Sequence, residues 1–330
     1  MTSNELIRAL GPLASLYTDR NVMEILVDAP NRVLVEREGK LVDAEVQFDS
    51  SGEIRKVIDN LLAVCGVTLQ PGETVGDMRL PDSSNRALVV LPPTALNGPT
   101  LVIHKWNSNP ISWEDLLRWG ALTQGAGEFL THAMQSQVST LVTGGTGSGK
   151  TSFANRLAEL IPATERLVVV EAAHEMLIRH PRALFLEANE PAHLSLIDLL
   201  TTASKMRPDW LITGELTGPE AMRAIQLMSR GHTGMTTLHA NNPEDALARL
   251  EAMCLMAHLG LGLGEIRLLI ASALQLITCQ HKLDKTGKRR ITHITELRGL
   301  ENERYILQPL FRYNYEKDRL EPTGVAPSWG

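Results

Sequence analysis

The chain has 330 residues, of which 43% are hydrophobic and 21% are charged, and its formal net charge is −6. This is the composition of a globular protein, and at about 150 residues per domain the length allows two domains with a core each. Because the chain is not basic overall, its composition argues against a nucleic-acid-binding protein.

The expected location is the cytoplasm. The three cysteines are odd in number and far apart, which fits neither a disulfide framework nor a zinc site and indicates a reducing compartment. Glu5 and Arg8 interrupt the stretch where a secretory signal would need an apolar core. The longest apolar run, 268–279, is shorter than the roughly 20 residues of a membrane-spanning helix. We therefore expect no direct membrane span, and membrane contact only through partners.

The first part of the chain predicts a small α+β domain over residues 1–106. Residues 22–48 contain short β-rich runs separated by turn residues, which is typical of a meander. Residues 53–65 carry apolar side chains at helical spacing, and further strands are predicted at 86–93 and 99–106.

Residues 107–122 predict a linker followed by a short helix, with Ser112 as N-cap and Asp115 three residues later. From 123 to 330 strands alternate with helices, which favours a sheet with helices on its faces. The alternating segments are a strand at 139–145, a helix from 150, a strand at 166–173, a helix near 195–205, a strand at 209–216, a helix from 219 and a strand at 234–240.

A phosphate-binding motif lies at residues 144–151, "GGTGSGKT", which satisfies G-x-x-x-x-G-K-[ST]. It follows an apolar strand and begins a helix, so backbone N–H groups and the helix N-terminus can face phosphates. Lys150 is expected to reach the β- and γ-phosphates, and Thr151 to hold Mg²⁺. The alternative is a glycine-rich turn with a surface lysine. The predicted nucleotide-binding residues here are Gly144, Gly145, Thr146, Gly147, Ser148, Gly149, Lys150, Thr151 and Ser152.

Acidic residues for catalysis follow two later strands. Glu215 ends a strand where a Walker B acid belongs, although Gly214 takes the place of the usual Asp. A solvated loop glutamate is the alternative interpretation. Glu171 and Glu175, four residues apart after another strand, compete for the role of activating water. The residues alone leave this choice open.

His239 ends a further strand, just before a helix with Asn242 as N-cap, Pro243 at the first position and Asp245 at the third. Its place on the same edge as the other sites predicts a contact with the γ-phosphate. A histidine used only for packing is the alternative.

Taken together, several segments resemble the type II/type IV secretion ATPase superfamily, most closely the CpaF-type ATPases of tight-adherence (Flp) pilus assembly. The resemblance covers nearly the whole chain. The segments that carry it are "ILVDAPNRVLVEREGKLV", "MRLPDSSNRALVVLPPTALNGPTLVIHKW", "LVTGGTGSGKTSFANRLAELIP", "MRPDWLITGEL", "GHTGMTTLHANNPEDALARLEAM" and "ITHITEL".

The resemblance implies a RecA-like P-loop ATPase domain around a mainly parallel central sheet, preceded by a PAS-like α+β domain. "EAAHE" matches the family's E-D-x-x-E box, whose second glutamate is the base, so Glu175 is the expected base and Glu171 supports it. "GEL" matches the Walker B segment, so Glu215 would hold Mg²⁺ with Thr151, partly through water. "TLHAN" matches the His box around His239.

The implied assembly is a homohexamer at the inner face of the cytoplasmic membrane, using ATP and Mg²⁺. It would drive an inner-membrane platform protein that adds or removes pilus subunits.

The chain also departs from the family pattern. Residues that replace a conserved aspartate or arginine are Ala172, Thr217, His104, Phe185 and Asn189, whereas Arg79, Arg86 and Arg207 remain as expected nucleotide contacts. A well-placed arginine is worth about 10³–10⁵ in phosphoryl-transfer rate, so ATP binding is better supported than fast hydrolysis. Thr217 has an alternative role as N-cap of a helix beginning at Pro219.

Two rival functions follow from these departures and from one further motif. The first is a catalytically weak ATP-binding paralogue that serves as a structural or regulatory ring subunit. The second is a GTPase switch, because "HKLD" at 281–284 imitates the guanine-reading N-K-x-D. However, His281 replaces the asparagine, and the D-x-x-G from Asp284 to Gly287 follows the motif instead of lying between it and the phosphate loop.

Overall fold

A computed structural model describes residues 3–37, 40–81, 85–105, 111–188, 194–283 and 287–329. The chain divides into an N-terminal unit, Met1–Asn109, and a C-terminal unit, Pro110–Gly330. The end of the predicted first domain and the start of the predicted linker lie outside the described residues. No helix in the described ranges is long and apolar enough to span a lipid bilayer.

The N-terminal unit is an antiparallel six-stranded sheet in the order β3-β2-β1-β6-β5-β4, with helices packed on it. The meander predicted at 22–48 is present as β1, β2 and β3. Its elements are α1 (Ser3–Leu10), a 3₁₀ turn (Gly11–Leu13), α2 (Ala14–Thr18), β1 (Val22–Ala29), β2 (Arg32–Arg37), β3 (Lys40–Asp43), α3 (Ser51–Cys65), β4 (Val75–Arg79), β5 (Arg86–Val90) and β6 (Thr100–His104).

Alternate residues of the central strands, such as Ile25 and Ile103, are fully buried together with Ile54 and Ile58 of α3. This alternation is what a sheet with one covered face requires. Helix α3 begins after Ser50, whose side chain accepts the N–H of Glu53. The predicted α+β character of this unit is therefore confirmed.

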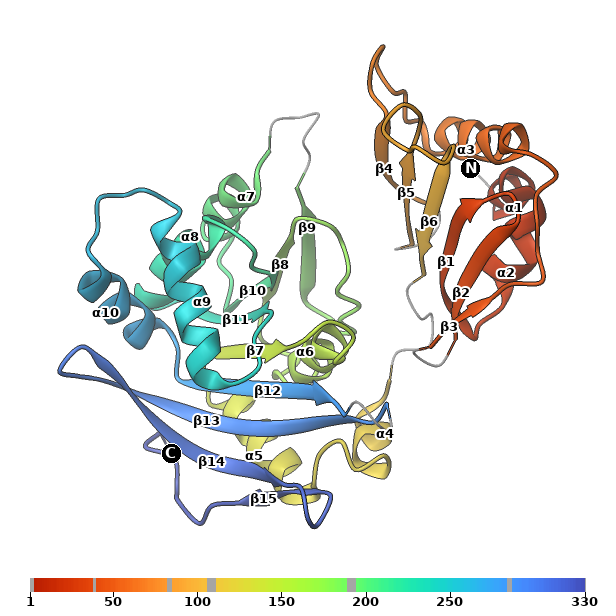
Figure 1. Ribbon diagram of the computed structural model, residues 1–330. Coiled ribbons are helices and arrows are strands. Elements are labelled where there is room, and N and C mark those ends of the chain that lie inside the picture. The colour runs from red at the N-terminus through yellow and green to blue at the C-terminus, as the bar shows by residue number, and fades with distance from the viewer. Residues whose placement is uncertain are drawn as a thin grey trace. The chain divides into compact units, whose positions relative to one another are not determined.

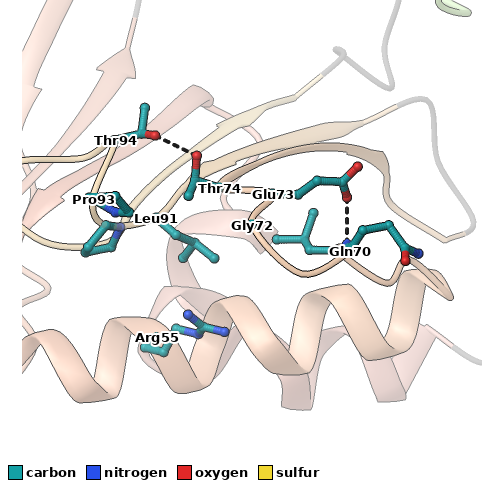
Figure 2. Close-up of a pocket in the computed structure, with 10 residues that line it drawn as sticks. Arg55, Gln70, Gly72, Glu73, Thr74, Leu91, Pro93 and Thr94 are labelled. Atoms are coloured by element: carbon teal, nitrogen blue, oxygen red, sulfur yellow. Dashed lines mark hydrogen bonds between the residues drawn. The ribbon is translucent and has the colours of Figure 1, made fainter.

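A hollow of about 530 Å³ lies in this unit between α3 and the segments around Thr74 and Thr94 (Figure 2). Its polar groups bond to one another: Glu73 accepts the N–H of Gln70 at 2.7 Å, and the hydroxyls of Thr74 and Thr94 are 2.6 Å apart. These four groups are satisfied within the wall, and Arg55, which also lines the hollow, bonds through Nε to Asp59 at 2.8 Å.

The C-terminal unit is built on a nine-stranded sheet in the order β15-β14-β13-β12-β7-β11-β10-β8-β9. The run from β12 to β9 is parallel, whereas β13, β14 and β15 add antiparallel strands at one edge. The strands are β7 (Thr140–Gly144), β8 (Leu167–Glu171), β9 (Ala183–Glu187), β10 (Trp210–Glu215), β11 (Thr233–Leu238), β12 (Leu276–Lys282), β13 (Arg289–Glu301), β14 (Arg304–Asn314) and β15 (Arg319–Pro322).

Helices cover both faces of this sheet (Figure 1). Successive strand residues alternate between two cores: Val142 packs with α5 and α6, and Leu141 packs with the helices of the other face. Strands buried on both sides are typical of parallel sheets and explain the unbroken apolar runs in the sequence. The helices are α4 (Trp113–Arg118), α5 (Gln124–Gln135), α6 (Lys150–Ala158), α7 (Leu196–Ala203), α8 (Glu220–Ser229), α9 (Pro243–Leu255) and α10 (Leu263–Ala273).

Helix starts test the predicted caps. The side chain of Ser112 accepts the N–H of Asp115, and that of Asn242 accepts the N–H of Asp245, so both predicted N-caps are confirmed.

The predicted N-cap role of Thr217 is wrong. Helix α8 begins at Glu220 with Pro219 as its N-cap. Glu220 Oε1 instead accepts the N–H groups of Thr217 and Gly218, each at 2.7 Å. The glutamate satisfies these backbone donors from inside the helix, so the threonine side chain is not needed as a cap.

Candidate nucleotide site

The phosphate loop, residues 144–151, connects the end of β7 to the start of α6, as its sequence predicts. Gly147 and Gly149 have positive φ angles, +69° and +89°, which favour glycine. A side chain at Gly144 would collide with Ser148 Oγ and come within 2.7 Å of the carbonyl oxygen of Gln280 on β12. Gly144, Gly147 and Gly149 are thus explained by backbone conformation and by close packing against the neighbouring strand.

Two buried polar atoms beside the loop have no hydrogen-bond partner among the described residues: Ser148 Oγ and Gln280 Nε2. Buried polar atoms are nearly always paired in folded proteins, so these two suit a polar ligand. Behind them, the hydroxyl of Thr143 bonds to Cys279 Sγ at 3.0 Å, and burial raises the pKa of this thiol to about 12. The residues present therefore fit a phosphate-bearing nucleotide, with a neutral wall behind the loop.

The carboxyl ends of adjacent parallel strands bring three predicted residues into contact. Lys150 Nζ lies 2.9 Å from Glu215 Oε2 and 2.9 Å from His239 Nε2. His239 Nε2 is in turn 3.0 Å from Glu215 Oε1. Glu215 ends β10, His239 follows β11, and Lys150 follows β7, so the sheet order β7-β11-β10 places them at one edge. Ligands of open α/β sheets bind at this edge.

Glu171, at the end of β8, organises the loop that contains Glu175. Glu171 is only 3% exposed. Its Oε1 accepts the N–H groups of Glu175 and Met176, each at 2.9 Å. Oε2 contacts His174 Nδ1 at 3.0 Å. The carboxylate of Glu171 is thereby bonded to its own loop, in which Glu175 is half-buried. The two glutamates, equivalent in sequence, have different environments.

Replacing Glu171 with alanine is expected to lower the free energy of unfolding by about 2–4 kcal/mol, because two backbone donors lose their acceptor at about 1–3 kcal/mol each. Urea unfolding of the full chain measures this. Glu171→Gln keeps an acceptor oxygen at the same place and serves as the matched control, with a smaller loss. An alanine variant as stable as the unaltered protein would contradict this role of the carboxylate.

The glycine before Glu215 also has a structural reason. An ideal Cβ at Gly214 would lie 3.0 Å from Glu171 Cγ, because β10 and β8 are neighbours in the sheet. An aspartate at 214 would push against the carboxylate that holds the neighbouring loop. The acidic side chain at the end of this strand is therefore that of Glu215, one residue later.

The positions that depart from the family pattern have local contacts of their own. Phe185 packs its ring against His174, with centroids 5.1 Å apart, and Ala172 is exposed. In the N-terminal unit, His104 Nδ1 contacts Glu24 Oε1 at 2.7 Å. Asn189 lies outside the described residues.

The three retained arginines lie on separate elements of the two units. Arg79 and Arg86 are paired in register on β4 and β5 of the N-terminal unit, and Arg86 also bonds Asp77 at 3.1 Å. Arg207 is exposed just before β10 and has a φ of +55°. It therefore lies at the amino end of the strand whose carboxyl end bears Glu215.

Sequence reasoning missed four residues of this region: His174, Glu187, Gln280 and Arg289. Glu187 Oε1 accepts the N–H of His174 at 3.0 Å, which links β9 to the Glu171 loop. Arg289 Nε donates to the carbonyl of Gly147 at 2.9 Å. The run of three cations at 288–290 is a pattern in the sequence that could have indicated Arg289. The place of Gln280 beside the loop depends on the pairing of β12 with β7, which the sequence does not indicate.

A model of the family described as type II/IV secretion system protein matches residues 8–305. The chain belongs to this family. Among its relatives, the conjugal transfer protein TrbB of Rhizobium radiobacter is 28% identical over 293 residues, which cover 87% of this chain and 87% of TrbB. The family resemblance predicted from the sequence is thus confirmed; its CpaF-type branch stays a prediction.

Two solved structures share the fold of this chain. The Legionella pneumophila ATPase DotB has a TM-score of 0.57 at 16% identity, with 88% of this chain and 80% of DotB covered. The pilus retraction motor PilT with bound ADP has a TM-score of 0.62 at 16% identity, with 88% and 83% covered. These likenesses, with the mainly parallel sheet and its covering helices, confirm the predicted RecA-like fold class.

Proposed function

We propose that this protein is the ATP-hydrolysing motor of a secretion or pilus machine. The observation that carries the proposal is the cluster of Lys150, Glu215 and His239 at the sheet edge beside the phosphate loop. A cation, a metal-binding carboxylate and a polar ring around one phosphate site are the parts that phosphoryl transfer needs. The names of DotB, an ATPase, and PilT, a motor with bound ADP, support the same function.

In this proposal each side chain has one role. Lys150, now held between Glu215 and His239, exchanges these partners for the β- and γ-phosphates. Thr151 and Glu215 would hold Mg²⁺, Glu215 partly through water, and the ion would supply positive charge for the phosphates. His239 contacts the γ-phosphate. Glu175 accepts a proton from the attacking water, and Glu171 keeps the Glu175 loop in shape through its backbone contacts.

The proposed assembly is a homohexamer at the inner face of the cytoplasmic membrane, where ATP hydrolysis acts on an inner-membrane platform protein of a tight-adherence (Flp) pilus or a related system. In a ring, a neighbouring subunit can supply cations that the site of one chain lacks. Arg79, Arg86 and Arg207 are the proposed donors, because the family resemblance implies nucleotide-contacting arginines at these positions.

Particle imaging of the full chain with a non-hydrolysable ATP analogue and Mg²⁺ tests this function. Six-membered rings with nucleotide at the phosphate loop are expected, and the images would also reveal which arginines reach the phosphates. Omission of Mg²⁺ is the control, with weaker nucleotide density expected because Thr151 and Glu215 lose their shared metal. Monomers with an empty phosphate loop would contradict the motor.

A second candidate is a ring subunit that binds ATP but hydrolyses it poorly. It is favoured by Thr217 and Phe185, two positions where the family has arginine. Threonine and phenylalanine carry no charge, so neither offers a cation to phosphate. In the structure the backbone of Thr217 is bonded to Glu220, and the ring of Phe185 packs on His174. Steady-state hydrolysis by the unaltered protein separates the two candidates.

The GTPase interpretation receives less support. His281, which stands where guanine readers have asparagine, bonds through Nε2 to the carbonyl of Asn241 at 2.5 Å. Asp284, the acid of the same motif, lies outside the described residues. Displacement of bound ATP analogue by GTP but not by ATP would reverse this preference.

A further inference from the structure

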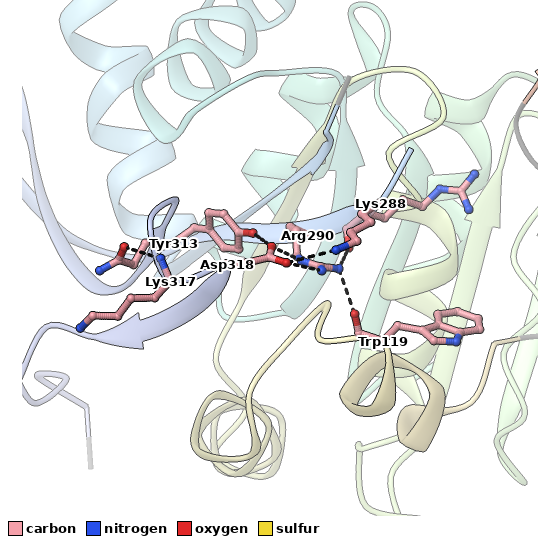
Figure 3. Close-up of polar contacts among 8 residues, drawn as sticks. Trp119, Lys288, Arg290, Tyr313, Lys317 and Asp318 are labelled. Atoms are coloured by element: carbon pink, nitrogen blue, oxygen red, sulfur yellow. Dashed lines mark hydrogen bonds and ion pairs between the residues drawn. The ribbon is translucent and has the colours of Figure 1, made fainter. Parts of the chain in front are cut away.

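Three consecutive cations lie at the start of β13, and their side chains point in two directions. Lys288 Nζ and Arg290 Nε each lie 3.2 Å from a carboxylate oxygen of Asp318, whose pKa is lowered by hydrogen bonds from Tyr313 and these cations (Figure 3). Arg290 also donates to the carbonyl of Trp119 at 2.9 Å. Because side chains alternate along a strand, the residue between them faces the other way.

Arg289 lies across the phosphate loop. Its Nε donates to the carbonyl of Gly147 at 2.9 Å, and its Cδ is 3.2 Å from the position that a Cβ would take at Gly149. The side chain thus spans the two glycines with positive φ. In the part of the chain that the structure describes, no carboxylate forms an ion pair with Arg289, in contrast to Lys288 and Arg290.

The peptide group between Gly147 and Ser148 is consequently held at both ends. Its N–H, that of Ser148, donates to the carbonyl of Gly145 at 3.1 Å, and its carbonyl accepts from Arg289. Glycine loops lose more conformational freedom on ordering than other segments, so a fixed peptide plane matters most in such a loop. A hydrogen bond from a charged donor is about twice as strong as a neutral one.

We propose that Arg289 is a positioning residue for nucleotide binding, which shapes the phosphate loop before the phosphates of ATP arrive. The inference rests on the proposed function for the identity of the ligand. Preorganisation of a binding loop raises affinity, because less ordering remains to be done when the ligand binds. The effect is exerted through Gly147, and Arg289 itself takes no part in the chemistry.

The experiment compares Arg289→Ala with Arg289→Lys, and uses Lys288→Ala as matched control for loss of a neighbouring cation. The first measurement is hydrogen exchange of residues 144–151 in the nucleotide-free protein. Arg289→Ala is expected to exchange about tenfold faster in the phosphate loop, the factor associated with one charge-assisted hydrogen bond. Arg289→Lys, which keeps a charged donor, should retain part of the protection, and Lys288→Ala should match the unaltered protein.

The second measurement is the steady-state KM and kcat for ATP of the same variants. Arg289→Ala should raise KM about tenfold with kcat nearly unchanged. The lost interaction stabilises bound ATP and the transition state equally, so its loss weakens binding without slowing the chemical step. Unchanged loop exchange in Arg289→Ala overturns the positioning role, even if ATP is hydrolysed. If Arg289→Ala loosens the phosphate loop but the unaltered protein binds no ATP, the proposed function is overturned. The positioning contact between Arg289 and the loop would then still stand.

Discussion

Lys150→Ala is expected to weaken MgATP binding by about a hundredfold or more and to abolish measurable hydrolysis. The Lys150 ammonium is nearly buried and lies 2.9 Å from both Glu215 and His239, so the substitution removes a positive charge from the centre of this cluster. In the variant, Glu215 also keeps a negative charge beside the phosphate loop without its counter-ion. Repulsion between this carboxylate and the phosphates adds to the lost attraction.

Calorimetric titration with MgATP and a steady-state assay measure the effect of Lys150→Ala. The control is Lys317→Ala, which removes the same charge from an exposed lysine that pairs with Glu321 on the C-terminal strands. Equal ATP affinity of Lys150→Ala and the unaltered protein would be incompatible with the proposed site, whatever the hydrolysis rate.

Glu175→Gln is expected to lower the hydrolysis rate by about 10²–10⁴, the usual contribution of a general base, while ATP binding is retained. Glutamine has nearly the same shape but cannot accept the proton of the attacking water. The backbone N–H of residue 175 would still bond to Glu171, so the loop keeps its shape. Single-turnover hydrolysis with preloaded ATP separates this chemical step from binding.

Glu171→Gln is the comparison that distinguishes the two carboxylates. Its amide oxygen can still accept the N–H groups of Glu175 and Met176, so hydrolysis should fall less than in Glu175→Gln. The reverse order would transfer the role of base to Glu171. If the unaltered protein and Glu175→Gln both hydrolyse ATP only at the background rate, the non-hydrolysing ring subunit becomes the better description.

Sequence patterns predicted the structure correctly where neighbouring residues determine the backbone conformation. Ser112 and Asn242 cap their helices because the acceptor and its N–H are three residues apart. The phosphate loop sits between a strand and a helix, since its glycines and the following apolar helix encode that turn locally. Alternation of strands and helices also predicted a sheet with helices on its faces, and the family resemblance implied that this sheet is mainly parallel, an arrangement that needs such crossovers.

Residues whose roles depend on distant pairing were not predictable in this way. Thr217 looked like a cap, but a glutamate three residues later takes both nearby donors. The different environments of Glu171 and Glu175 follow from burial at the end of β8, which the spacing of two acids does not encode. Arg289 begins β13, which the sheet order places beside β12, and β12 lies beside β7. Arg289 reaches the phosphate loop because of this order, which local sequence patterns do not encode.

That sheet order has a consequence for synthesis of the chain. The strand β7 lies between β11 and β12, both made later, and the N–H of Ser139 next to β7 bonds to a side chain 136 residues further on. At about 5–20 residues per second, this separation corresponds to a delay on the order of ten seconds on the ribosome. A growing or truncated chain that stops before β12 carries the phosphate-binding motif without the strand that packs against Gly144. The nucleotide site can therefore assemble in full only after β12 has been translated.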